Sequence, residues 1–155
     1  MRHILFLVAW TVVIIGLGIL PLRNFVGHSH WEFIKWMPTI DDLQSPKYLV
    51  EIVIDVAGNT LLFTPFGYLI NCVSGSRARA PGRQLLLAGC AGILLSCSIE
   101  YYQVYCHNRF PSLFDVVTNT SGSLLGARIA WLRGQAAPDD LRARTASPAS
   151  RAIRS

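Results

Sequence analysis

Residues 48–73 read YLVEIVIDVAGNTLLFTPFGYLINCV, an apolar run that is interrupted by Glu51, Asp55 and Asn59. As an α-helix, this run is longer than the about 20 residues that cross the hydrocarbon core of a bilayer. Its three polar residues recur at every fourth position, which places them on one face of the helix. Because a charged group in lipid is costly, such a face normally points into a bundle or a wet cavity. The stretch therefore predicts a membrane helix with one functional face.

Three more apolar runs, at residues 4–20, 84–105 and 113–132, are separated by polar segments. Only 15% of the 155 residues are charged, and the mean hydropathy is +0.38. Soluble domains carry about 25% charged residues. We expect an all-α, polytopic membrane protein with a four-helix transmembrane bundle over residues 1–133. The chain after it has little apolar content, which predicts a disordered cytoplasmic tail at 134–155.

The positions of lysine and arginine predict the orientation of the four spans. One side of the bundle holds Arg2, the clustered arginines of residues 77–83 and those after residue 132, and it has about twice as many basic residues as the other side. The positive-inside rule therefore puts both termini in the cytoplasm and the protein in the cell membrane. The same rule explains the net charge of +5. We expect the lipid bilayer as a partner, and no nucleic acid.

In this orientation, polar side chains from three helices and one loop lie at the same depth, near the outer surface. They are Asp55, Asn59, Glu100, Gln103, Arg109, Asp115 and Asn119. They could be structural, with Arg109 paired to Asp115 or Glu100 and the amides bonded between helices. They could instead bind a polar headgroup, a cation or a proton. The convergence of ionisable residues within a membrane favours the second interpretation.

Small residues on the same helices predict close packing. On the last run, a Gly-x-x-x-Gly pair follows the polar stripe on the same helix face, which is the pattern that lets two membrane helices approach closely. We expect four residues to serve helix packing: Pro65, Gly67, Gly122 and Gly126.

The histidines and cysteines predict no metal site. His28-x-His30 is a weak metal pattern, and we interpret these two residues, with His3 and His107, as solvated loop or terminal residues. The four cysteines form no CxxC pair and have no metal-ligand spacing. No histidine is placed as a base for a serine nucleophile. We therefore expect no metal and no cofactor, and assign no catalytic residue.

Two blocks of this sequence resemble the VanZ-like family, bacterial membrane proteins named for a member linked to teicoplanin resistance. The first block is Asp55-x-x-x-Asn59-x-x-x-Phe63-x-Pro65-x-Gly67. The second begins at Ser98-Ile99-Glu100 and continues through Gln103, Arg109, Asp115, Asn119, Gly122 and Gly126. The resemblance implies a four-helix membrane domain of the cell envelope. It also implies that the seven polar residues named above belong to the family's characteristic polar set. It implies no particular reaction. The family often has a histidine soon after an aspartate near the start of the domain, and this chain lacks it after Asp41-Asp42.

Together these features favour a binding protein over an enzyme. We expect a polar or lipid-linked envelope ligand, with a glycopeptide included, at the outer polar cluster. Two alternatives stay open. One is an intramembrane enzyme that acts on lipid-linked substrates with Glu100 or Asp115 as general base. The other is a small transporter or channel subunit, which would require a homo-oligomer because four spans form little pore alone.

Overall fold

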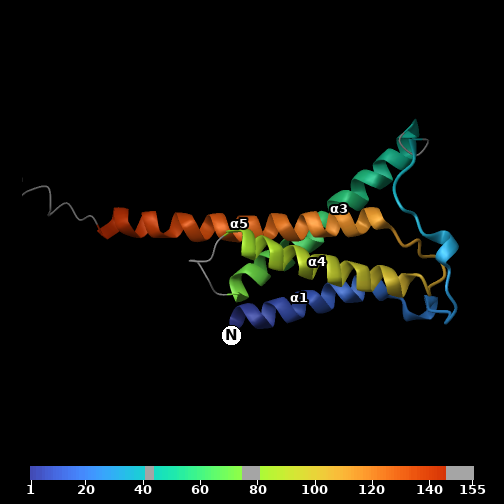
Figure 1. Ribbon diagram of the computed structural model, residues 1–155, viewed down its shortest axis with the longest axis horizontal. Helices are drawn as coiled ribbons and strands as arrows, with labels where there is room; N and C mark the ends of the chain where they lie inside the picture. Colours follow the sequence, from blue (N-terminus) through green and yellow to red (C-terminus); the bar gives the residue numbers. More distant parts are fainter. Residues whose placement is uncertain (41–43, 75–80, 146–155) are drawn as a thin grey trace, which may run out of the picture.

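The computed structural model describes residues 1–40, 44–74 and 81–145, which form a bundle of long helices (Figure 1). In chain order, with η for a 3₁₀ helix, the elements are α1 (Arg2–Ile19), η1 (Leu22–Asn24), η2 (Trp31–Phe33), α3 (Pro46–Val73), α4 (Pro81–Gln103) and α5 (Leu113–Thr145). Within these ranges no β-strand forms, and the loops contribute two isolated β-bridges. The predicted all-α helical bundle is confirmed.

Three helices are long and apolar enough to cross a membrane. Among the described residues these are α1, α3 and the Gly82–Gln103 part of α4. Large apolar side chains cover their outer surfaces, and Leu5, Val53 and Leu94 are each more than 60% exposed. Such surfaces suit lipid tails, which are as apolar as leucine itself. The chain is a helical membrane protein.

The fourth expected span, residues 113–132, lies within α5 but is less apolar than the other three. The reason is its larger content of polar residues, two of which bond to α4 rather than facing lipid. Asn119 donates a hydrogen bond to Ser96 of α4 at 2.9 Å, and Ser123 donates one to the Ala88 carbonyl of α4 at 2.8 Å. Full membrane crossing by α5 stays a prediction.

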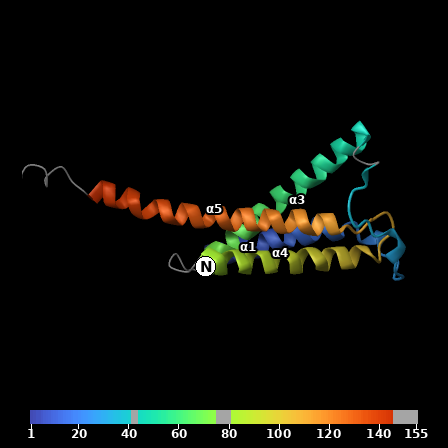
Figure 2. The same ribbon diagram turned by 45° about the horizontal axis from the view of Figure 1, so that its top comes forward.

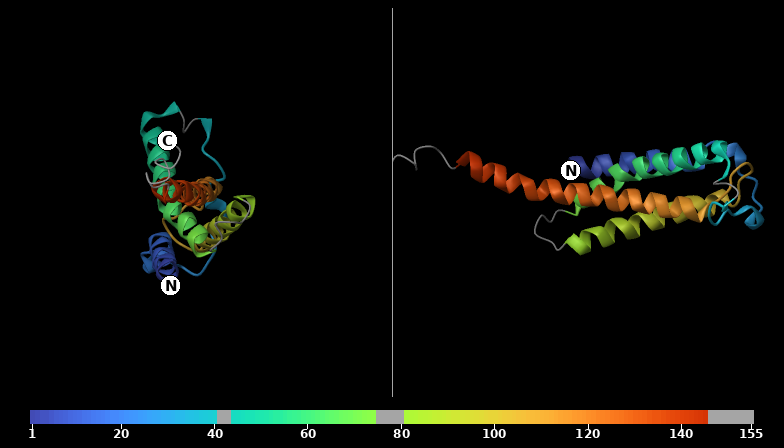
Figure 3. Two further views of the ribbon diagram at one scale, coloured as in Figure 1. Left: turned by 90° about the vertical axis from the view of Figure 1, so that its left-hand side faces the viewer. Right: turned by 90° about the horizontal axis from the view of Figure 1, so that it is seen from above.

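Helix α5 also continues to Thr145, whereas the sequence predicts a disordered tail from residue 134. Residues 134–145 contain three alanines and two arginines, which favour helix, although Pro138 also lies among them. Extending an existing helix also avoids the cost of nucleating a new one. This end of α5 projects beyond the other helices (Figures 1 and 3). The remaining predictions, for Asp41-Asp42, for Arg77 and Arg79, and for the tail at 146–155, lie outside the described residues.

Helices α3 and α5 approach most closely where glycines lie between them. A Cβ atom at Gly67 would overlap the backbone of α5, and one at Gly122 or Gly126 would overlap the backbone of α3. Any larger residue would have to push the two helices apart. Pro65, the fourth residue predicted to serve packing, is half-buried within α3.

Apolar side chains attach α1 to this pair. The core of the bundle is formed by Ile14, Phe63, Phe66 and Ile99, from α1, α3 and α4. Trp10 of α1 also donates its indole N–H to the Leu62 carbonyl of α3 at 2.9 Å. These contacts fix α1 against the side of the bundle.

The connections α1–α3 and α4–α5 gather at one end of the bundle (Figures 1 and 2). We call residues 20–40 and 104–112 the loop layer. Backbone hydrogen bonds join its two segments at four points: Val26 to Tyr105, His30 to Val104, Lys35 to Pro111, and His107 to Asn24. The N-terminus and the C-terminal end of α5 both lie at the opposite end (Figures 1 and 3). The bundle therefore has a structured loop end and an opposite end, at which α1 begins and beyond which α5 extends.

Candidate functional site

A cavity of about 520 Å³ lies under the loop layer, between the four long helices. The sequence analysis names seven polar residues as one cluster, and the structure places all of them on the lining of this cavity: Asp55, Asn59, Glu100, Gln103, Arg109, Asp115 and Asn119. Glu51, one turn before Asp55 on α3, joins them. Residues far apart in the chain thus share one site, and their binding role stays a prediction.

The three amide residues tie helices together. Asn59 of α3 donates to Thr118 of α5 at 3.4 Å. Gln103 of α4 donates to the Gly18 carbonyl of α1 at 2.9 Å. Asn119 donates to Ser96, as described above, and its buried Oδ1 atom has no hydrogen-bond partner among the described residues. The amides therefore fix helix register, and Asn119 keeps one acceptor for a ligand or water.

The carboxylates of the cavity differ in how they are held. Glu100 accepts a hydrogen bond from the Ser112 backbone N–H at 2.7 Å. Asp115 lies close enough to Asp55 and Glu100 for their charges to interact. Asp55 and Glu51 are exposed on the diverging first half of α3. Four carboxylates therefore face one space, where their charges repel unless a cationic or hydroxyl-bearing group binds among them.

Two basic side chains line the same cavity from the loop layer. Arg109 donates to the Leu20 carbonyl at 2.7 Å, at the end of α1. Within the described part of the chain, no ion pair joins Arg109 to Glu100 or Asp115, so the pairing considered in the structural interpretation does not form. Lys35 lies with its Nζ atom 5.3 Å from the centre of the Phe110 ring. These two cations are therefore placed to meet a bound anion.

The walls below the charges are apolar. Ile14 and Leu17 of α1, Phe63 of α3 and Ile99 of α4 line the cavity beside the carboxylates. A site of this composition can hold a molecule that is polar at one end and apolar at the other.

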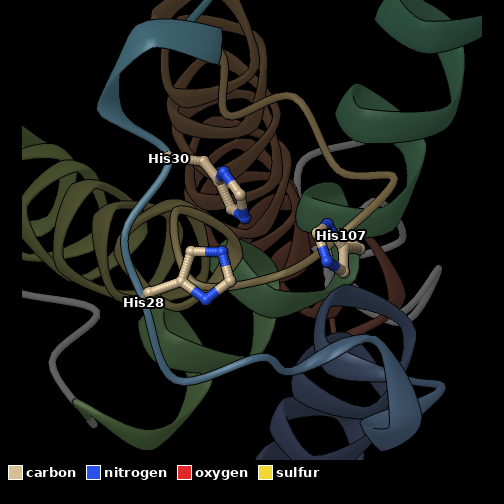
Figure 4. Close-up of side chains that lie close together, drawn as sticks. All are labelled: His28, His30 and His107. Carbon is tan, nitrogen blue, oxygen red and sulfur yellow. The ribbon is translucent and has the colours of Figure 1, made fainter.

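The structure also brings together residues that the sequence analysis keeps apart. His28, His30 and His107 meet in the loop layer, and their ligand atoms lie within 4.8 Å of one another (Figure 4). Lys35, to which the sequence interpretation gives no role in a site, also lines the cavity. Beyond the weak His28-x-His30 pattern, no sequence signal indicates either feature, because each depends on how two separate loops pair.

This combination defines a multi-pass integral membrane protein with a charged cavity among its helices. A family model described as VanZ/LLP1 matches residues 4–134, which is most of the chain. The protein belongs to the VanZ/LLP1 family, which confirms the resemblance found in its motifs. Comparisons with curated proteins and with solved structures give no match.

Proposed function

We propose that this protein binds the polar headgroup of a membrane amphiphile in the cavity under the loop layer, at the outer face of the cell membrane. The observation that carries the proposal is the mixed lining of a single cavity. It combines four carboxylates, two cations and apolar walls from helices that suit a membrane. The charged groups would meet a polar headgroup, and the apolar walls would meet the first part of its hydrocarbon chain.

The positions of the cations and carboxylates within the cavity indicate the chemistry of the headgroup. Arg109 and Lys35 lie in the loop layer, whereas Asp55 and Asp115 lie on α3 and α5. A guanidinium group binds phosphate well because its donors match the phosphate oxygens. With a phosphate at the loop layer, a neighbouring amine or hydroxyl group would meet the carboxylates. A phosphoethanolamine headgroup or a lipid-linked sugar phosphate of the cell envelope has this arrangement.

The distribution of charge supports an outward-facing cavity. The N-terminus and the C-terminal end of α5 lie opposite the loop layer, and Arg2 begins α1 at that end. Near the same end, Arg128 lies over the Trp131 ring at 4.6 Å and Arg133 over the Tyr68 ring at 5.8 Å. Basic and aromatic residues gather in this way at the cytoplasmic interface of membrane proteins. The opposite end, with the cavity, would then face outward.

A titration tests the proposal directly. The protein is purified in detergent and titrated with dihexanoyl phosphatidylethanolamine, with binding read by native mass spectrometry. Asp55→Asn should weaken binding about two- to fivefold, since it removes one partly exposed charge pair. Arg109→Gln should weaken it about tenfold or more, because it removes a charge-assisted hydrogen bond to phosphate. The matched control is Asp139→Asn, 24 residues after Asp115 on the same helix and so about 36 Å away.

Two comparisons in the same assay identify the headgroup. Dihexanoyl phosphatidylglycerol lacks the amine, so it should bind more weakly and should be insensitive to Asp55→Asn. A glycopeptide added as competitor should displace the lipid if the cavity also accepts that class of ligand. Equal binding of the lipid by the wild type, Asp55→Asn and Arg109→Gln would contradict the proposal. Disappearance of every cavity variant from the membrane would also contradict it, in favour of a purely structural cluster.

A further inference from the structure

A second group of chemically active side chains lies in the loop layer, apart from the amphiphile cavity. The rings of His28 and His30 have centroids 4.6 Å apart, and the ring of His107 lies 5.1 Å from His30 and 5.8 Å from His28. Figure 4 shows the three imidazoles around one shared space. They come from both segments of the loop layer, so the fold, rather than a local sequence motif, creates the group.

The backbone holds two of these histidines in place. The N–H of His30 donates to the Val104 carbonyl at 2.8 Å, and the N–H of His107 donates to the Asn24 carbonyl at 2.7 Å. Each bond runs from one segment of the loop layer to the other. Main-chain pairing therefore fixes the backbone positions of His30 and His107 relative to each other.

His30 has the surroundings of a metal ligand. The residue is only 9% exposed, and its Nε2 atom is buried without a hydrogen-bond partner among the described residues. Its other nitrogen, Nδ1, lies 3.4 Å from the carboxylate of Glu32. Metal-bound histidines commonly donate their second N–H to a carboxylate in this way, which leaves the opposite nitrogen free for the ion.

Glu32 is suited to that supporting role. Its carboxylate is exposed, lies 3.4 Å from Nδ1 of His30 and can accept the N–H of that nitrogen. This arrangement orients the unpartnered Nε2 atom of His30 away from Glu32.

We propose that His28, His30 and His107 bind one zinc ion, each through one ring nitrogen. Glu32 would accept the N–H of the other ring nitrogen of His30 and so orient this ligand. Imidazole suits zinc and similar transition metals, whereas magnesium and calcium prefer oxygen ligands. Three ligands leave a fourth position for water or another group. Tetrahedral zinc needs its ligand nitrogens about 3.3 Å apart. In the structure these ligand atoms lie within 4.8 Å of one another. Because His28 and His107 are exposed, their rings are free to turn toward the buried His30 and shorten these distances.

The ion would join the two segments of the loop layer by direct coordination. His107 lies two residues before Arg109, so a bound ion would also stabilise the part of the loop that carries a cavity cation. Zinc binding itself does not depend on what the amphiphile cavity binds.

The test is a zinc titration of the full-length protein, purified in detergent with an affinity tag that contains no histidine and then treated with a chelator. Isothermal titration calorimetry should give one zinc per chain, and magnesium at the same concentration should give none. His107→Asn alters an exposed side chain and should weaken zinc binding at least about tenfold. His30→Ala should have a larger effect, and Glu32→Gln should weaken binding about tenfold. His3→Ala, at the other end of the bundle, is the matched control and should bind as the wild type does.

Each result decides the question. Absence of zinc binding by the wild type would overturn the proposal. So would zinc affinity that is unchanged in His107→Asn, because the ion would then be held elsewhere, for example by the exposed thiols of Cys90 and Cys97. If His30→Ala does not fold, His107→Asn and Glu32→Gln still provide the answer, since both alter exposed side chains.

Discussion

The interface between α3 and α5 has two regions that differ sharply, although the same helix faces form both. Around Gly67, Gly122 and Gly126 the two backbones touch, and no side chain fits between them. Nearer the loop layer, α3 diverges from α5 (Figure 2). Asp55 and Asp115 line the cavity there. Small residues let helices close together in a membrane, whereas carboxylates need water or a polar partner. One polar-to-glycine stripe therefore supplies both a rigid contact and an open site.

We call the part around the three glycines the closed region and the part around the cavity the open region. The closed region also contains a side-chain amide that links three helices. Asn71 donates to Gln84 of α4 at 2.9 Å and to the Ala127 carbonyl of α5 at 3.0 Å, and both side chains are buried. One amide thus links three helices near the end of the bundle opposite the loop layer. We infer that this end is the stable part of the fold and that the loop end is the part adapted to a ligand.

The largest effect should follow from a bulky residue in the closed region. Gly126→Leu would force α5 away from α3, and overpacking of this kind costs about 3 kcal/mol. We expect the variant to be nearly absent from the membrane, as measured by size-exclusion chromatography of a fluorescent fusion. Gly58→Ala is the matched control, because no atom lies within 4 Å of its Cβ position. That change should leave abundance unchanged or improve it, since alanine favours helix over glycine. Normal abundance of Gly126→Leu would show that the two helices do not pack closely there.

A smaller loss should follow from breaking the amide link. Asn71→Leu removes two interhelical hydrogen bonds, each worth about 0.6 kcal/mol on average in membrane proteins. We expect a lower midpoint of thermal unfolding in detergent, followed by tryptophan fluorescence. Ser121→Ala is the control, because Ser121 is exposed and bonds only to the Val117 carbonyl within its own helix. Equal unfolding midpoints for the two variants would show that the hydrogen bonds of Asn71 do not stabilise this end of the bundle.

The single indole bond of α1 should contribute least among the interhelical contacts. Trp10→Phe keeps an aromatic ring and removes one hydrogen bond to the Leu62 carbonyl, so we expect a loss of about 0.6 kcal/mol. The same unfolding assay measures it. A loss as large as that of Gly126→Leu would mean that α1, rather than the α3–α5 contact, governs stability.

In the open region, substitution should hardly change stability. Asp55→Asn and Glu51→Gln alter exposed carboxylates, and we expect both unfolding midpoints to stay near that of the wild type, within about 0.5 kcal/mol. If either variant were as unstable as Asn71→Leu, the carboxylates would be structural, and the contrast between the two regions would fail.

Much of this arrangement could be predicted from sequence because it depends on helical periodicity. The spacing of Asp55 and Asn59, and that of Gly122 and Gly126, fixes which residues share a face. The long apolar runs fix where the helices lie. The predicted polar cluster accordingly lies on one cavity, although sequence could not separate the bonded amides from the open carboxylates.

Features that depend on the loops could not be predicted. The bond of Arg109 to the Leu20 carbonyl, in place of a carboxylate, follows from how the loop layer folds over the end of α1. His107 lies 77 residues after His30, and no local pattern connects them. The continuation of α5 beyond residue 133 follows from its attachment to a packed helix, which composition alone does not reveal.

Thiol labelling in intact cells tests on which side of the membrane the polar cavity opens, which we propose to be the outer side. In a background without the four native cysteines, Asp55→Cys places a thiol at the cavity and Gly82→Cys places one at the opposite end of the bundle, where a side chain meets open space. A membrane-impermeant maleimide should label Asp55→Cys in intact cells and Gly82→Cys only after the cells are opened. The reverse pattern would contradict the account.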